Sequence, residues 1–200
     1  TGKLPIEINF ALVPSQESEQ FTAYAFGDPQ AYNLEEIQYF KDGIVNEIDN
    51  NKAVFGISLG DLVGDDLDLH LPYKNAIKEI GLPWYNVIGN HDMNYDAKID
   101  EHSDESFEQN FGPANYSYNY GKVHFIVLDN ILYPDPRDGK SYWGGFREDQ
   151  LKFIENDLKH VPKDHLIVLS HHIPLADNNG EWFRVEDRDR LFDLLAEYPN

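Results

Sequence analysis

Cysteine is absent from the 200-residue chain. The sequence therefore offers no disulfide framework, no thiolate metal site and no cysteine nucleophile, and any metal ligands must be His, Asp, Glu, Asn or Gln. Basic residues are scarce, because 16 Lys and Arg stand against 36 Asp and Glu and leave a formal charge of −20. Such a chain repels phosphate backbones and anionic lipid heads, and its sequence contains no Lys/Arg cluster to offset this. The composition argues against nucleic acid or a membrane surface as a partner.

Long apolar runs are missing as well. No stretch approaches the roughly 20 residues of a membrane span, and residues 1–10 lack the charged and apolar regions of a signal peptide. These absences leave the compartment open, since an acidic chain without cysteine fits the cytosol and the bacterial periplasm or exterior alike. The hydrophobic content of 41% and aromatic content of 14% suit a globular domain with a sizeable core.

From residue 21 onward, buried strands alternate with helical patterns. Nearly continuous apolar runs predict strands, and apolar residues at helical spacing predict helices. The strands are expected within 21–28, 53–61, 83–92 and 165–172, and the helices within 34–50, 72–81, 147–161 and 187–200. Two further strand-like runs around Gly121 predict a hairpin. The pattern indicates an α/β fold with a layered sheet, parallel in its centre, to which an antiparallel hairpin is added.

Four of the predicted strands end in a polar cluster. In an α/β sheet, the carboxyl ends of the strands form the edge where ligands bind, so we expect these clusters to converge. Oxygen and imidazole donors without sulfur suit Mn²⁺, Fe, Zn²⁺ or Mg²⁺, and the clusters therefore suggest a metal site. The clusters are GDPQ at 27–30, GD at 60–61, GNHD at 89–92 and SHH at 170–172, and a glycine opens each of the first three.

These clusters resemble the successive motifs of the calcineurin-like metallophosphoesterases: GDxH, GD, GNHD or GNHE, a lone His after a buried strand, and GHxH. The resemblance covers residue 21 to the C-terminus, and the spacing is similar to the family's, with Asp61 33 positions after Asp28 and Asn90 29 positions after Asp61. Four motifs in order are far more specific than any one of them. The resemblance implies a layered, mixed β-sheet sandwich flanked by helices.

The resemblance also implies a set of metal ligands. Asp28 would bind one metal ion, Asp61 would bridge two, and Asn90 and His171 would bind the second. Position 30 departs from the family, because Gln30 stands where most members have His. An amide oxygen at this place favours Mn²⁺ or Mg²⁺ over Zn²⁺, and it resembles the manganese-dependent diphosphatase and phosphodiesterase branches. We therefore expect two divalent cations, with Mn²⁺ favoured and Fe, Zn²⁺ or Mg²⁺ as alternatives.

Three further residues receive roles near the substrate from the resemblance. His91 would lie over the phosphate and donate a hydrogen bond or a proton to the leaving oxygen, with Asp92 orienting its ring. His172 would lie near the substrate or behind the metal ligands, and the sequence leaves its role open. The implied activity is hydrolysis of a small phosphate monoester, diester or pyrophosphate by water that two metal ions activate.

The GHxH motif occurs nowhere in the chain, which stops at Asn200. We therefore expect residues 21–200 to be a phosphoesterase domain that is incomplete at its C-terminus, with a weak or empty metal site. Residues 1–20 would be a strand and linker from an upstream module, and further domains of the same polypeptide would follow.

Less specific interpretations remain for several features. The missing GHxH motif and Gln30 also fit a catalytically inactive or binding module that keeps the fold. A nucleotide-binding α/β protein of another kind is disfavoured, because neither GxGxxG nor GxxxxGK[ST] occurs. The charge run at Asp65, Asp66 and Asp68 suggests a solvated loop. Alternating tyrosines at 116, 118 and 120 predict sheet packing.

Overall fold

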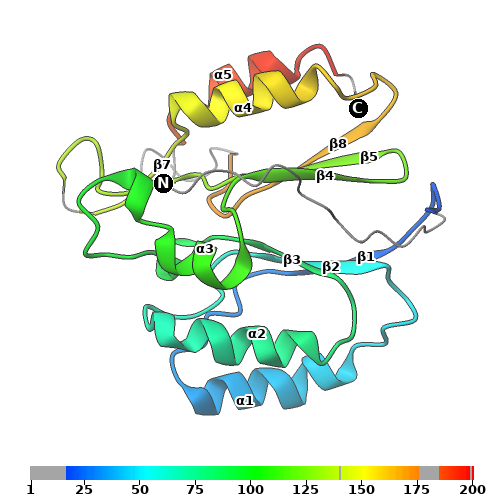
Figure 1. Ribbon diagram of the computed structural model, residues 1–200, viewed down its shortest axis with the longest axis vertical. Coiled ribbons are helices and arrows are strands. Elements are labelled where there is room, and N and C mark those ends of the chain that lie inside the picture. The colour runs from blue at the N-terminus through cyan, green and yellow to red at the C-terminus, as the bar shows by residue number, and fades with distance from the viewer. Residues whose placement is uncertain (1–16, 140, 176–184, 199) are drawn as a thin grey trace, which may run out of the picture.

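The computed structural model describes residues 17–139, 141–175, 185–198 and 200. Residues 1–16 lie outside these ranges, so the strand and linker expected in residues 1–20 stay a prediction. The described chain forms four layers, with two sheets packed face to face between two pairs of helices (Figure 1). None of the helices in the described ranges combines the length and the apolar character that crossing a membrane requires.

The first sheet contains three parallel strands in the order β1-β2-β3. These strands are β1 (Ala23–Phe26), β2 (Phe55–Leu59) and β3 (Trp84–Val87). The crossover helices cover its outer face (Figure 1) and are α1 (Leu34–Gly43) and α2 (His70–Lys78). The α1 helix is shorter than the predicted span of 34–50, because glycine at its end and the β-branched Ile44 and Val45 after it are poor helix formers.

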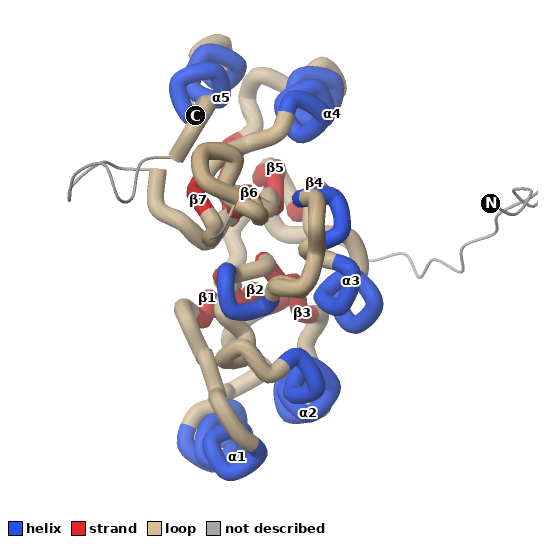
Figure 2. The backbone as a smooth tube through the Cα atoms, turned by 90° about the vertical axis from the view of Figure 1, so that its left-hand side faces the viewer, coloured by secondary structure: helices blue, strands red, loops and turns tan. Residues whose placement is uncertain are grey.

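The second sheet has the order β4-β5-β8, with β4 antiparallel and β8 parallel to β5. Its strands are β4 (Tyr116–Tyr120), β5 (Val123–Val127) and β8 (Leu166–Ser170). Two helices cover its outer face, α4 (Glu148–Leu158) and α5 (Arg188–Leu195) (Figure 2). The predicted hairpin is therefore present, but it belongs to this second sheet with β8 and does not extend a single central sheet. The sandwich flanked by helices is confirmed.

Aromatic side chains fill the space between the two sheets. Tyr118 of β4 stacks on Tyr85 of β3 at 3.8 Å between ring centroids, and it stacks on Phe125 of β5 at 4.8 Å. Phe55 of β2 meets Tyr118 edge to face at 5.8 Å. Aromatic pairs of this kind contribute about 0.5–1.5 kcal/mol beyond their buried area. The prediction that the alternating tyrosines pack between strands is confirmed.

Three small elements were not predicted. The first is a helix at the end of the acidic segment 95–111, and its Phe107 is fully buried. Between β5 and α4, two short antiparallel strands hold a loop near the carboxyl ends of the main strands, and we call its described residues, 133–139, 141 and 142, the β6–β7 loop. The elements are α3 (Glu105–Phe111), β6 (Ile131–Leu132) and β7 (Trp143–Gly144).

Candidate metal centre and its cavity

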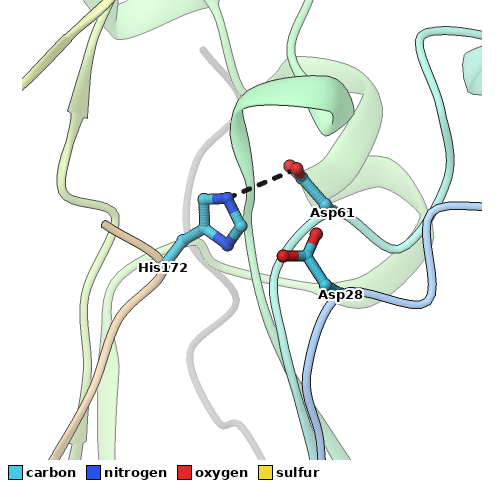
Figure 3. Close-up of side chains that lie close together, drawn as sticks. All are labelled: Asp28, Asp61 and His172. Carbon is cyan, nitrogen blue, oxygen red and sulfur yellow. Dashed lines mark ion pairs between the residues drawn. The ribbon is translucent and has the colours of Figure 1, made fainter. Parts of the chain in front are cut away.

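Asp28, Asp61 and His172 converge at the carboxyl ends of β1, β2 and β8 (Figure 3). One ligand atom from each residue lies within 4.8 Å of the others. Two of these residues follow strands of the first sheet and one follows a strand of the second, so the site lies where the two sheets meet. The predicted convergence of strand ends is observed, and it involves both sheets.

The ring of His172 is oriented as a metal-binding imidazole would be. Its Nδ1 lies 2.9 Å from the carbonyl oxygen of Leu59, so Nδ1 carries the proton and donates it to that carbonyl. Its Nε2 lies 3.2 Å from Oδ1 of Asn90 and 3.4 Å from Oδ2 of Asp61. Metal-binding histidines typically donate the other ring N–H to a carbonyl or carboxylate, which fixes the tautomer. The Nε2 atom and the two oxygens therefore face a common point.

The charges at this point are strongly coupled. Burial alone would lower the pKa of His172, but the hydrogen bond and charge of Asp61 outweigh it and raise the pKa to about 9. Burial and the neighbouring charge of Asp61 raise the pKa of Asp28. Burial opposes ionisation of Asp61 too, yet the hydrogen bond from His172 keeps the pKa of Asp61 below its ordinary value. Two carboxylates and a basic imidazole are a donor set that fits a divalent cation.

The backbone around the cluster is strained. Among the described residues, five other than glycine have positive φ, and four of them lie here: Asp28, Gln30, Asp61 and Asp65, with φ of 56°, 42°, 49° and 63°. Such residues cost about 1–3 kcal/mol each and occur preferentially at functional sites. The backbone N–H of Gln30 also donates to the backbone carbonyl oxygen of Asp61 at 2.7 Å. This hydrogen bond joins the loop after β1 to the loop after β2.

Two glycines permit the close approach of these loops. A Cβ at Gly60, where φ is 94°, would lie 2.4 Å from Nδ1 of His172. A Cβ at Gly89 would lie 2.0 Å from the backbone nitrogen of Asp61. The third glycine of the motifs differs, because a Cβ at Gly27 would meet nothing within 4 Å. Close packing therefore explains the glycine in the second and third motifs.

His91 lies at the rim of the cluster, and Asp65 is the partner of its ring. Nδ1 of His91 is 2.7 Å from Oδ1 of Asp65, and Nε2 is 4.0 Å from Oδ2 of Asp61. The backbone N–H of His91 donates to Oδ1 of Asp61 at 2.9 Å. The interpretation of Asp65 as part of a merely solvated charge run missed this contact, since its position four residues after Asp61 gave no reason to pair it with His91.

Asp92 does not orient the ring of His91, which corrects the role implied by resemblance. Its carboxylate is fully buried and accepts hydrogen bonds from the backbone N–H groups of Leu62 at 3.0 Å and Gly89 at 2.8 Å. Nε2 of His70 lies 3.2 Å from the same carboxylate. Asp92 therefore holds the loop after β2 and the loop after β3 together, and it is not among the residues that line the cavity described below.

His171 and Gln30 are not part of the cluster of Asp28, Asp61 and His172. His171 lines the cavity described below, and burial lowers its pKa. Of the two adjacent histidines, the structure brings His172 and not His171 together with Asp28 and Asp61. Gln30 is half-buried in the loop after β1, and its role as a ligand stays a prediction.

A cavity of about 610 Å³ opens over the cluster. Asp28, Asn90 and His172 line one part of it, and Tyr142, Trp143 and Arg137 of the β6–β7 loop and the adjoining strand line another. Cavities of about 300–1,000 Å³ hold organic ligands of drug size. The space is therefore much larger than a single phosphate group requires.

The fold and the cluster together are those of a calcineurin-like phosphoesterase, and the model of that family matches residues 21–197. The chain belongs to this family. It is 29% identical over 130 residues to a probable glycerophosphodiester phosphodiesterase, GpdQ, of Arcobacter nitrofigilis, an alignment that covers 63% of this chain and 45% of that protein. The chain thus spans less than half the length of this curated relative.

Among solved structures, the chain resembles a dimetal phosphatase from Danio rerio. The TM-score is 0.62 at 13% sequence identity, and the match covers 89% of this chain and 78% of that one. At this identity the likeness shows the fold, and it agrees with the sandwich described above.

Proposed function

We propose that this chain is the catalytic domain of a metal-dependent phosphoesterase that hydrolyses a phosphate diester, monoester or pyrophosphate with two divalent cations. The observation that carries the proposal is the convergence of Nε2 of His172 with the oxygens of Asp61 and Asn90, beside Asp28. An imidazole fixed by the carbonyl of Leu59 and facing such oxygens is arranged for a metal ion.

The residues divide into two sets of ligands around a shared carboxylate. Asp28, Gln30 and Asp61 would hold one cation, and Asp61, Asn90 and His172 the other. His172 takes the place that the sequence interpretation gave to His171, because it is the histidine in the cluster. When bound, the two cations would supply Lewis acidity to the phosphate and lower the pKa of the attacking water. Oxygen-rich donors with one imidazole favour Mn²⁺ or Mg²⁺.

His91 would act on the leaving oxygen. Its hydrogen bond to Asp65 holds the ring at Nδ1, so Nε2 is the atom left to face a phosphoester over the cluster. From there Nε2 can donate a hydrogen bond to the developing charge or a proton to the leaving group. Asp65 is the positioning residue for this ring, and Asp92 supports the loops that carry it.

A diester is the favoured substrate class. The relative from Arcobacter nitrofigilis is named a probable glycerophosphodiester phosphodiesterase, and Gln30 resembles the first motif of phosphodiesterase and diphosphatase branches. The cavity of about 610 Å³ leaves room for an organic group on either side of the phosphate.

The test compares two Asp→Asn substitutions that change the charge equally. Asp61→Asn removes the shared carboxylate but keeps its shape, and Asp68→Asn changes an exposed carboxylate on the following loop. Mn²⁺ titration by calorimetry and hydrolysis of bis-p-nitrophenyl phosphate are measured for this chain and for the full product of its gene. We expect about two Mn²⁺ per full-length molecule, loss of binding and turnover in Asp61→Asn, and no change in Asp68→Asn.

Two outcomes would count against the proposal. If the full-length product bound no Mn²⁺ and hydrolysed no ester, the chain would be a binding module that retains the fold. If Asp61→Asn behaved like Asp68→Asn, the cluster would not be the metal site.

A further inference from the structure

Arg137 is the one Lys or Arg side chain among the described residues that line the cavity over the cluster. A cation is unusual at this place, because the chain as a whole has a formal charge of −20. The carboxylates of Asp28 and Asp61 lie at the other part of the same site, where bound cations would offset them. Arg137 therefore contributes guanidinium N–H donors to the cavity, separate from the metal ligands.

Arg137 is held in place by its neighbours. Its Nε lies 3.0 Å and its Nη2 2.7 Å from the carboxylate of Asp135, whose side chain is 1% exposed. Its guanidinium carbon lies 3.2 Å from the ring centroid of Trp143. A bidentate carboxylate and an aromatic face fix a guanidinium, so little entropy is lost when it binds a ligand.

The same side chain keeps donors for a ligand. It is 49% exposed, and its hydrogen bonds to the other residues that the structure describes use Nε and Nη2 and leave Nη1 available. A guanidinium offers five N–H groups in a planar fork, which matches carboxylate and phosphate oxygens. Arg137 lines the cavity in addition to pairing with Asp135 in its own loop, so its role extends beyond closing that loop.

The β6–β7 loop also connects Arg137 to the cluster. Tyr142 lies on this loop and lines the same cavity as Asp28 and His172. Tyr142 and Trp143 give the cavity an aromatic wall next to the guanidinium. One loop thus brings an aromatic surface and a fixed cation to the cavity that holds the cluster.

We propose that Arg137 recognises an anionic group, a carboxylate or a second phosphate, on the half of the substrate that does not react. This inference rests on the proposed phosphoesterase activity and narrows its substrate class. The reacting phosphate would lie at the cluster, the ester arm would pass along Tyr142, and its anionic end would bind Nη1 of Arg137.

The first experiment compares three p-nitrophenyl phosphodiesters with the same leaving group, whose second arms are ethyl, 2-carboxyethyl and choline. The carboxyethyl ester can accept a charge-assisted hydrogen bond from Arg137 and the ethyl ester can accept none at that arm, so we expect a KM about tenfold lower for the carboxyethyl ester. The choline ester should have the highest KM. Arg137→Gln should remove the preference while kcat/KM for the ethyl ester stays within about twofold.

Arg190→Gln is the matched control. Arg190 has the same exposure, 50%, and also pairs with a carboxylate, that of Glu148 at 2.7 Å, but it lies on α5 outside the cavity. This variant should keep the preference for the carboxyethyl ester. Asp135→Asn frees the guanidinium without removing its charge, and it should reduce the preference only in part.

A binding measurement separates recognition from hydrolysis. Calorimetry with Mn²⁺-loaded protein should show tighter binding of 2-carboxyethylphosphonate than of ethylphosphonate, and Arg137→Gln should abolish the difference. Equal affinity of the wild type for the two phosphonates, or an equal loss for all three esters in Arg137→Gln, overturns the inference. If no ester is hydrolysed but the difference in binding persists and depends on Arg137, the proposed activity fails and the recognition stands.

Discussion

Replacing His172 with Ala should weaken Mn²⁺ binding far more than replacing His171. Nε2 of His172 faces Asn90 and Asp61, and Nδ1 is committed to the carbonyl of Leu59. Losing a residue that merely orients a ligand costs about 10–100-fold in metal affinity. Losing the ligand itself should cost more, so we expect His172→Ala to lower the Mn²⁺ affinity at least about 100-fold, which corresponds to about 2.7 kcal/mol of binding free energy. His171→Ala should cost less than about tenfold.

Calorimetric titration of both variants with Mn²⁺ at one pH measures this difference directly. His171 is a fair control, because it is adjacent in sequence, lines the same cavity and is similarly buried. Thermal unfolding without metal shows whether either variant has lost its fold. The reasoning is refuted if His171→Ala binds Mn²⁺ more weakly than His172→Ala, or if His172→Ala stays within about threefold of the wild type.

Two further predictions follow from side chains that contact no metal in the proposal. Asp65→Asn should lower kcat on bis-p-nitrophenyl phosphate about 10–100-fold with Mn²⁺ affinity within twofold, because it loosens the ring of His91 and general acid catalysis contributes at least about 10²-fold; unchanged kcat would contradict the role of Asp65. Burial raises the pKa of Asp129 from 3.8 to about 8, so the folded state favours the protonated carboxyl. The contribution of Asp129 to the free energy of unfolding is therefore fully present below about pH 4 and is lost as the pH rises to 8. Urea unfolding between pH 5 and 8 should therefore show a component of at most about 1.4 kcal/mol per pH unit that Asp129→Asn removes, and an unchanged slope in that variant would contradict it.

The main elements of the fold were predictable because each strand is a short apolar run bounded by turn residues. The assignment of strands to sheets was not. The pattern of β5 and β8 is that of buried parallel strands, and nothing in it distinguishes a place in the first sheet from a place in a second. The aromatic contacts between Tyr85 and Tyr118 decide this, and they depend on residues far apart in the sequence.

The roles of neighbouring residues in the third motif were also beyond the sequence. His91 and Asp92 are adjacent, which suggests that one could support the other. They lie in a 3₁₀ turn, Asn90–Asp92, in which successive side chains point about 120° apart. Asp92 consequently points into the loops below while His91 points to the rim, and His91 takes its partner, Asp65, from another loop.

The choice between His171 and His172 has a similar cause. Side chains alternate between the two faces of a strand, but β8 ends at Ser170, so alternation no longer fixes which of the next two residues faces the cluster. The carbonyl of Leu59, at the end of a strand in the other sheet, decides it by accepting the Nδ1 proton of His172. The residues of the candidate cluster thus come from both sheets, and the geometry of the cluster depends on the packing between the sheets. Sequence motifs identify which loops approach one another, whereas the contact between the sheets determines which side chains face the cluster.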